Sequence, residues 1–155
     1  MYINYKIIIK SKHWPRRHKE VKKNIIRIFK YKKILGFNDK LKYFCNIVLM
    51  NDAIIRKFNK QYRKKNKVTD VLTFVSKIKK NSVIENHCDI ILSADTAIHD
   101  AKKNNIDFYD HFAHLIIHSI LHINGYSHNN NKNYLKMKSK EIYILNRLGI
   151  SNPYL

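Results

Sequence analysis

The sequence contains few of the residues that usually divide a chain into separate units. Its 155 residues include only three Gly and two Pro, so neither a flexible linker nor an internal repeat is apparent. The length suits one domain, since domains of about 100–150 residues are the commonest and have a hydrophobic core of their own. We therefore expect a single domain spanning residues 1–155.

Cysteine is scarce, and long apolar runs are missing. Cys45 and Cys88 lie far apart in apolar surroundings, which favours two buried, reduced thiols over a disulfide framework or a cysteine zinc site. No run reaches the roughly 18 consecutive apolar residues of a membrane-spanning helix, and the first residues do not resemble a secretory signal. We therefore expect a cytoplasmic protein that does not associate with membranes.

Acidic residues are outnumbered by basic ones. The chain has 11 Asp and Glu against 31 Lys and Arg, a formal net charge of +20. Such an excess attracts polyanions through its long-range field and through counterion release. The lysines also fit an ordinary solvated surface, because Lys, Asn and Ile are abundant throughout the sequence. The charge favours a nucleic acid partner without identifying it.

The spacing of apolar residues predicts an α+β domain. Strands are expected at residues 2–10, 41–50, 71–75 and 89–92, where β-branched and aromatic residues alternate or run together. Helices are expected at residues 21–35, from 51 or 52 to 62, 93–104, from 107 or 110 to 124, and 133–148, with Gly36 ending the first and Gly149 capping the last. This order lacks strict alternation, so we predict a small mixed sheet of about four strands covered by about five helices.

Three histidines at the end of one predicted helix form the most informative pattern. His118, His122 and His128 follow the spacing H-x-x-x-H-x-x-G-x-x-H. On a helix the first two imidazoles lie one turn apart, with Cβ atoms about 5–6 Å apart, so both can bind one ion at roughly 2.0–2.1 Å. Gly125 can adopt a positive φ, end the helix and turn His128 back toward the same point. The spacing predicts a metal site.

Three nitrogen ligands are typical of a catalytic zinc ion. They leave the fourth tetrahedral position open to water, and zinc-bound water can have a pKa near 7, so hydroxide forms without a strong protein base. The alternative is three core or surface histidines that fall at these intervals by chance. The intervening glycine makes that alternative the weaker one. The same three-histidine set also accepts nickel, cobalt or copper.

The histidine spacing also occurs in metzincin proteases, whose motif places a glutamate after the first histidine as general base. Here that position is Ser119, and a serine hydroxyl does not accept a proton near neutral pH as a carboxylate does. This substitution argues against a protease. His111 and His114 lie on the same helical stripe, and we expect them to pack or to donate hydrogen bonds rather than to bind metal.

Three sequence blocks carry a family resemblance. Residues 113–128 read A-H-L-I-I-H-S-I-L-H-I-N-G-Y-S-H, residues 59–74 read N-K-Q-Y-R-K-K-N-K-V-T-D-V-L-T-F, and residues 88–93 read C-D-I-I-L-S. In these blocks the chain resembles the YbeY family, bacterial single-strand-specific endoribonucleases that mature small-subunit ribosomal RNA. The tail from Glu141 to Tyr154 also fits the family. The likeness covers roughly the C-terminal two-thirds of the chain.

The resemblance implies a zinc-dependent endoribonuclease for 16S ribosomal RNA maturation and ribosome quality control. Its partners would be single-stranded RNA, ribosomal RNA and the small ribosomal subunit. It implies that His118, His122 and His128 bind Zn²⁺ and that Arg63 and His118 are catalytic. A guanidinium offers bidentate, permanently charged donors to phosphoryl oxygens that gather negative charge in the transition state. The nucleophile stays open between zinc-bound hydroxide and the ribose 2′-hydroxyl.

The chain departs from the family pattern at Ser119, Ser127, Asn66, Val68 and Cys88, none of them a predicted ligand. Ser127 replaces a carboxylate beside the last histidine, and loss of a group that orients an imidazole typically changes metal affinity or rate by ~10–100-fold.

Two other functions stay open. One is a non-catalytic, RNA-binding ribosome assembly factor with a structural zinc, and the weaker one is a metalloprotease with an unusual base.

Overall fold

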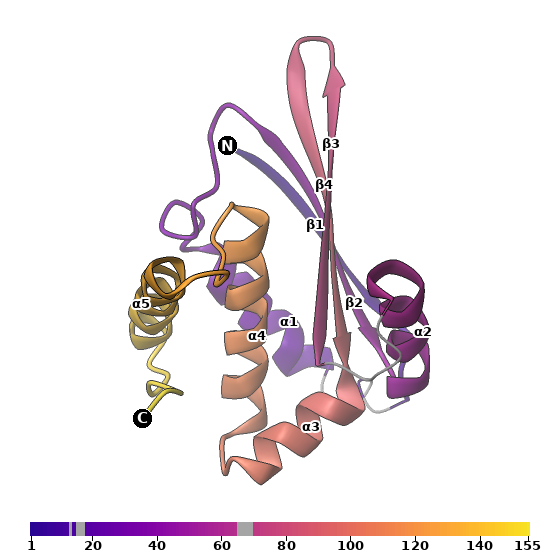
Figure 1. Ribbon diagram of the computed structural model, residues 1–155, viewed down its shortest axis with the longest axis vertical. Coiled ribbons are helices and arrows are strands. Elements are labelled where there is room, and N and C mark those ends of the chain that lie inside the picture. The colour runs from indigo at the N-terminus through magenta and orange to yellow at the C-terminus, as the bar shows by residue number, and fades with distance from the viewer. Residues whose placement is uncertain (13, 15–17, 65–69) are drawn as a thin grey trace.

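A mixed sheet lies between two unequal layers of helices in the computed structural model, which describes residues 1–12, 14, 18–64 and 70–155 (Figure 1). Its strands are β1 (Tyr2–Ile9), β2 (Lys42–Met50), β3 (Val71–Lys80) and β4 (Val83–Ser93). Their spatial order is β1-β2-β4-β3, with β1, β2 and β4 parallel and β3 antiparallel to β4. The predicted four-stranded mixed sheet is confirmed.

Five helices occur in the described ranges: α1 (His18–Phe29), α2 (Asp52–Arg63), α3 (Ala94–Lys103), α4 (Phe108–Ile123) and α5 (Asn131–Arg147). α2 lies by itself on one face of the sheet, whereas α1 and α4 cover the other face and α5 packs on the outer side of α4 (Figure 1). The predicted α+β class is therefore confirmed. Within these ranges no helix is long and apolar enough to span a membrane.

Short polar side chains begin four of the helices. Asn51, Ser93, Asp107 and Asn130 each accept a hydrogen bond from a backbone N–H in the first turn of the helix that follows. Such N-caps satisfy donors that have no partner within the helix. The structure thereby chooses Asn51 over Asp52 for α2 and Asp107 over Asp110 for α4.

The two faces of the sheet contribute to different hydrophobic clusters, because side chains alternate along each strand. The larger cluster joins α1 and α4 to β1, β2 and β4. The smaller cluster lies under α2 and contains the buried residues Val48, Met50, Ile55, Leu72 and Ile91. β3 is an edge strand whose side chains pack on both faces of the sheet. Val71 packs against the larger cluster, whereas Leu72 and Phe74 pack in the smaller one.

The cysteine prediction is confirmed in the core of the sheet. Cys45 and Cys88 are register partners on the neighbouring strands β2 and β4, and both are buried free thiols. Their apolar surroundings agree with a structural role, because reactive cysteines usually lie in exposed, electropositive places.

Three predicted elements differ most in length from the structure. The first helix was expected at residues 21–35, but α1 ends at Phe29, and separate turns continue to Gly36 while keeping Leu35 buried. Apolar spacing does not distinguish such turns from a continuing helix. The strands expected at residues 71–75 and 89–92 are longer, because β3 and β4 extend as a hairpin whose turn, Asn81 and Ser82, has positive φ at both residues.

Candidate metal centre

The end of α4 is built to return the chain toward the histidines. The Tyr126 N–H donates to the Leu121 carbonyl at 3.0 Å, and the Gly125 N–H donates to the His122 carbonyl at 3.1 Å. These two bonds form the Schellman motif, which requires a positive φ at the glycine position, here +91° for Gly125. The turn brings His128 back beside α4, as the glycine in the spacing predicts.

The three imidazoles converge through their Nε2 atoms. The Nε2 of His122 lies 3.0 Å from that of His118 and 3.2 Å from that of His128. Nitrogens that bind a tetrahedral zinc ion at roughly 2.0–2.1 Å lie about 3.3 Å apart, so this spacing fits a shared ion. The three histidines therefore have the donor type and the separation that a divalent transition metal requires.

Hydrogen bonds at Nδ1 prepare two of the rings for a metal. The Nδ1–H of His122 donates to the Tyr126 carbonyl at 3.0 Å, and the Nδ1–H of His118 donates to Glu141 Oε1 at 2.5 Å. A neutral imidazole carries one N–H, so both rings keep a lone pair on Nε2. Burial and the neighbouring imidazoles also lower the pKa of His122, which favours the neutral form that binds metals.

Glu141, from α5, is a buried carboxylate behind His118. Only 1% of its surface is exposed, and it accepts hydrogen bonds from His118, from His114 Nε2 at 2.7 Å and from the Tyr154 hydroxyl. Burial raises the pKa of Glu141, but these three hydrogen bonds outweigh it and hold the pKa at about 2. Glu141 is therefore ionised and orients His118. The prediction that His114 donates a hydrogen bond agrees with this contact.

A cavity of about 420 Å³ places Arg63 with the three histidines. It is lined by Arg63, Asp70, Val71, Thr73, Val75, His118, His122 and His128. Its volume lies within the ~300–1,000 Å³ of typical ligand sites. Arg63 is an exposed residue in the last turn of α2. Because α2 and α4 lie on opposite faces of the sheet, Arg63 and the histidines of α4 reach the cavity from opposite sides of the edge strand β3 (Figure 1). A permanent cation and three nitrogen donors thus share one open space.

Asp70 brings a carboxylate into this cavity that sequence analysis did not select. Its carbonyl accepts the Ser93 N–H at 2.9 Å, which holds the start of β3 beside the end of β4. A carboxylate oxygen of Asp70 also lies within 4.8 Å of ligand atoms of Asp100 and His111, a second group that could hold a cation. The only indication in the sequence was that Asp70 is the middle residue of T-D-V in residues 59–74, one of the three blocks that resemble the family.

None of the departures from the family pattern within the described residues lies among those that line the cavity. Ser119 is fully buried in the core, so its side chain does not reach the place where a protease base would act. The Ser127 hydroxyl donates to Asn129 Oδ1 at 3.0 Å. Asn66 and Val68 lie outside the described residues.

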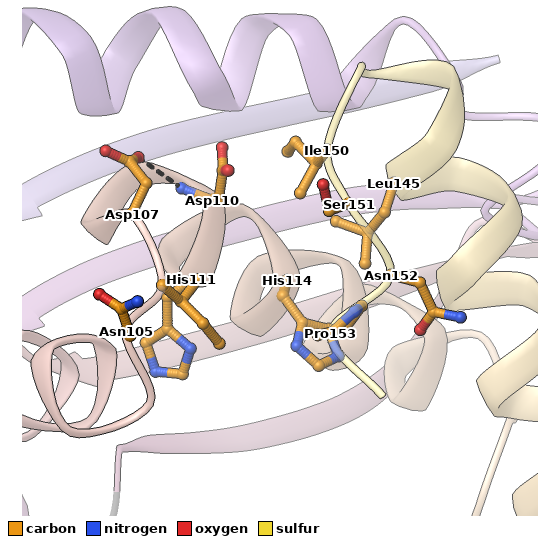
Figure 2. Close-up of a pocket in the computed structure, with 11 residues that line it drawn as sticks. Asn105, Asp107, Asp110, His111, His114, Leu145, Ile150, Ser151, Asn152 and Pro153 are labelled. Atoms are coloured by element: carbon orange, nitrogen blue, oxygen red, sulfur yellow. Dashed lines mark hydrogen bonds between the residues drawn. The ribbon is translucent and has the colours of Figure 1, made fainter. Parts of the chain in front are cut away.

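A smaller cavity of about 200 Å³ lies between the first half of α4 and the C-terminal tail, residues 149–155 (Figure 2). His111 and His114 line it from α4, and Leu145 and Ile150 face them from α5 and the tail. The volume is below the ~300 Å³ at which ligand pockets usually begin. We therefore assign the site to the larger cavity, which contains Arg63 and the three imidazoles.

Comparison with known proteins identifies similar sequences over nearly the whole chain. A family model described as Endoribonuclease YbeY matches residues 6–149. A protein of Colwellia psychrerythraea with that name is 39% identical over 109 residues, which cover 70% of each chain. Another from Ehrlichia chaffeensis is 34% identical over 152 residues, covering 97% of this chain and 90% of the relative. The similarity extends further toward the N-terminus than the three sequence blocks indicated.

A solved structure has a similar fold. The solution structure of TM1509 from Thermotoga maritima aligns with a TM-score of 0.56 and 23% sequence identity. The alignment covers 94% of this chain and 91% of the other. At that identity the similarity supports the arrangement of helices and strands.

Proposed function

The chain belongs to the YbeY endoribonuclease family, and on this premise we propose that it is a zinc-dependent endoribonuclease that cleaves single-stranded ribosomal RNA. The proposed roles are small-subunit (16S) RNA maturation and ribosome quality control in the cytoplasm. One observation carries the proposal: a single cavity contains Arg63 and the three converging imidazoles. The net charge of +20 suits a polyanionic substrate.

His118, His122 and His128 would hold the ion. An all-nitrogen set suits zinc and its transition-metal neighbours, whereas magnesium and calcium prefer oxygen ligands. A bound zinc ion supplies Lewis acidity, which activates a nucleophile and neutralises charge on a phosphoryl oxygen.

The chain's own residues perform the remaining tasks. Arg63 donates hydrogen bonds to the non-bridging oxygens, whose negative charge grows in the transition state. Asp70, the carboxylate in the same cavity, accepts the proton that the attacking water or ribose hydroxyl loses as its oxygen bonds to phosphorus. The bond from phosphorus to the leaving ribose oxygen breaks, and Asp70 returns the proton to that oxygen. Glu141 holds the His118 ring in the orientation that directs Nε2 toward the cavity.

Two attacking groups satisfy this arrangement, water and the ribose 2′-hydroxyl next to the scissile phosphate. Product analysis separates them, because attack by the ribose leaves a 2′,3′-cyclic phosphate and attack by water leaves none. Mass spectrometry of a short RNA after a single cleavage gives the answer directly.

The proposal is tested by metal analysis and RNA cleavage on the same protein samples. We expect the wild type to bind one metal ion and to cleave single-stranded RNA, and His122→Ala to lose both properties. Arg63→Ala should keep the metal and lose about 10²–10³-fold in cleavage rate, as for other groups that stabilise charge in a transition state. A metal-loaded wild type that leaves single-stranded RNA intact would exclude the nuclease function.

The alternative is an RNA-binding ribosome assembly factor with a structural zinc. The contact that favours it is the buried Glu141, which links His118 of α4 to α5 and to Tyr154 of the tail, so a metal at His118 could fasten these elements together. In that case His118→Ala unfolds the protein, and the folded, metal-bound wild type binds RNA without cleaving it. Circular dichroism beside the cleavage assay distinguishes the two functions.

A further inference from the structure

A cavity with aromatic walls lies on the α2 face of the sheet, behind the metal centre. Its volume is about 360 Å³, and we call it the aromatic cavity. Its lining consists of Phe58, Tyr62, Phe74, Val75, Ser76, Asp89 and Ile91. These residues come from α2, β3 and β4, and neither the metal site nor the proposed chemistry uses the cavity.

The cavity of about 420 Å³ that contains Arg63 and the three histidines is called the metal cavity below. The aromatic cavity and the metal cavity meet across the edge strand β3. Side chains alternate along β3, so Phe74 and Ser76 line the aromatic cavity while Val71 and Thr73 line the metal cavity. The exposed Val75 lines both. A flexible chain that passes over Val75 would contact both cavities.

Tyr62 presents an aromatic ring to solvent at this position. The residue is 57% exposed, yet its ring contacts Phe58 at 5.7 Å with nearly parallel planes and Phe74 at 5.5 Å edge to face. These contacts restrict the ring before any ligand arrives, which lowers the entropy lost on binding. Tyr62 directly precedes Arg63 in the last turn of α2, and Tyr62 lines the aromatic cavity whereas Arg63 lines the cavity of the three histidines.

The charges around the aromatic cavity favour a polyanion that carries flat rings. Exposed basic residues lie along α2 and at its C-cap: Lys57, Lys60, Arg63 and Lys64. The acidic residue in the lining is Asp89, whose Oδ1 accepts a hydrogen bond from Asn46 at 2.9 Å. Phosphates are therefore attracted to the α2 rim and repelled by Asp89, while an uncharged aromatic ring can enter.

We propose that the aromatic cavity binds a nucleobase of the RNA whose backbone passes Arg63, with the base stacked on Tyr62. Base stacking on exposed aromatic side chains beside a basic groove is how proteins bind single-stranded nucleic acid without reading its sequence. A base in a duplex is already stacked and paired, so the subsite selects single strands. The inference rests on the proposed function, because it assumes that RNA reaches the metal cavity.

The test separates base binding from phosphate binding by comparing two fluorescent oligonucleotides with the metal-loaded protein. One is a single-stranded 2′-deoxy oligomer, which lacks the ribose hydroxyl, and the other has the same backbone with abasic positions throughout. We expect Tyr62→Ala to weaken binding of the first roughly 10-fold in fluorescence anisotropy and to leave binding of the second unchanged. Arg63→Ala should weaken both.

The matched control is Tyr143→Ala, which removes a tyrosine of 45% exposure from α5, and it should bind both oligomers like the wild type. Tyr62→Phe should also bind like the wild type, because it keeps the ring. If Tyr62→Ala binds the base-containing oligomer as tightly as the wild type does, the inference is wrong, and the aromatic cavity would suit a protein segment instead. Cleavage of RNA by the wild type is scored separately, so that result leaves the proposed function standing.

Discussion

The two halves of α4 carry histidines at helical spacing but place them in different surroundings. In the first half, His111 and His114 line the small cavity under the C-terminal tail (Figure 2). His114 also donates a hydrogen bond to Glu141. In the second half, His118 and His122 face an open cavity with Arg63. The comparison shows that coverage by other elements, rather than residue type or helix position, determines which imidazoles face the open cavity.

Asp70 offers the sharpest test of this comparison, because it lies near His111 and also lines the metal cavity. We expect Asp70→Asn to lower kcat for RNA cleavage by ~10²–10⁴-fold, the usual contribution of a general base. Asp100→Asn is the matched control, since Asp100 shares the group with His111 but does not line the metal cavity. Equal losses in both variants would show that the group has only a structural role. Steady-state kinetics with the metal-loaded proteins provides the measurement.

Glu141 connects the two halves of α4 through His114 and His118, so it tests whether the buried half supports the open one. Glu141→Gln keeps the shape and removes the charge that orients His118. We expect its dissociation constant for zinc to rise by ~10–100-fold, measured by competition with a chromophoric chelator. Glu20→Gln, an exposed change on α1, should bind zinc like the wild type. Unchanged affinity in Glu141→Gln would limit that residue to packing.

Gly125 tests whether the turn after α4 positions His128. Gly125→Ala forces an L-residue to φ of +91°, which costs about 1–2 kcal/mol, and the added Cβ itself meets no atom within 4 Å. Gly149→Ala imposes the same kind of strain at φ of +77°, also in open space but after α5. Urea denaturation should show similar losses of stability in both variants. Zinc affinity should fall only in Gly125→Ala, and an equal fall in both would contradict the role of the turn.

His111 gives the smallest expected effect, a pH dependence of stability. Burial lowers its pKa below the ordinary 6.5, although nearby Asp70 partly opposes this. The unfolded chain therefore binds a proton at His111 more readily than the folded one, so this contribution to stability is present above pH 6.5 and is lost as the pH falls below it. Urea unfolding from pH 8 to 5 should show a steeper decline for the wild type than for His111→Asn. The exposed His99, changed to Asn, should leave the decline as in the wild type.

Local patterns predicted much of the fold and part of the candidate site. Apolar spacing and capping residues located all nine described elements, and the histidine spacing with Gly125 identified the converging imidazoles. The predicted ends of helices and strands were wrong where tertiary contacts or exposure determine how far an element extends. The outer half of the β3–β4 hairpin, for example, has only scattered apolar residues, of which Ile78 and Ile84 are exposed, and it extends beyond the helices that cover the sheet (Figure 1).

The sequence by itself determined which groups can lie on one helix face and where the chain can turn, because 3.6-residue periodicity and the φ of glycine are local properties. Only the tertiary structure decided that Arg63 and Asp70 share a cavity with His118, and that Glu141 is buried behind that ring. These residues come from α2, the start of β3 and α5, and contacts between such elements depend on sheet order and helix packing. No spacing within a single segment contains that information.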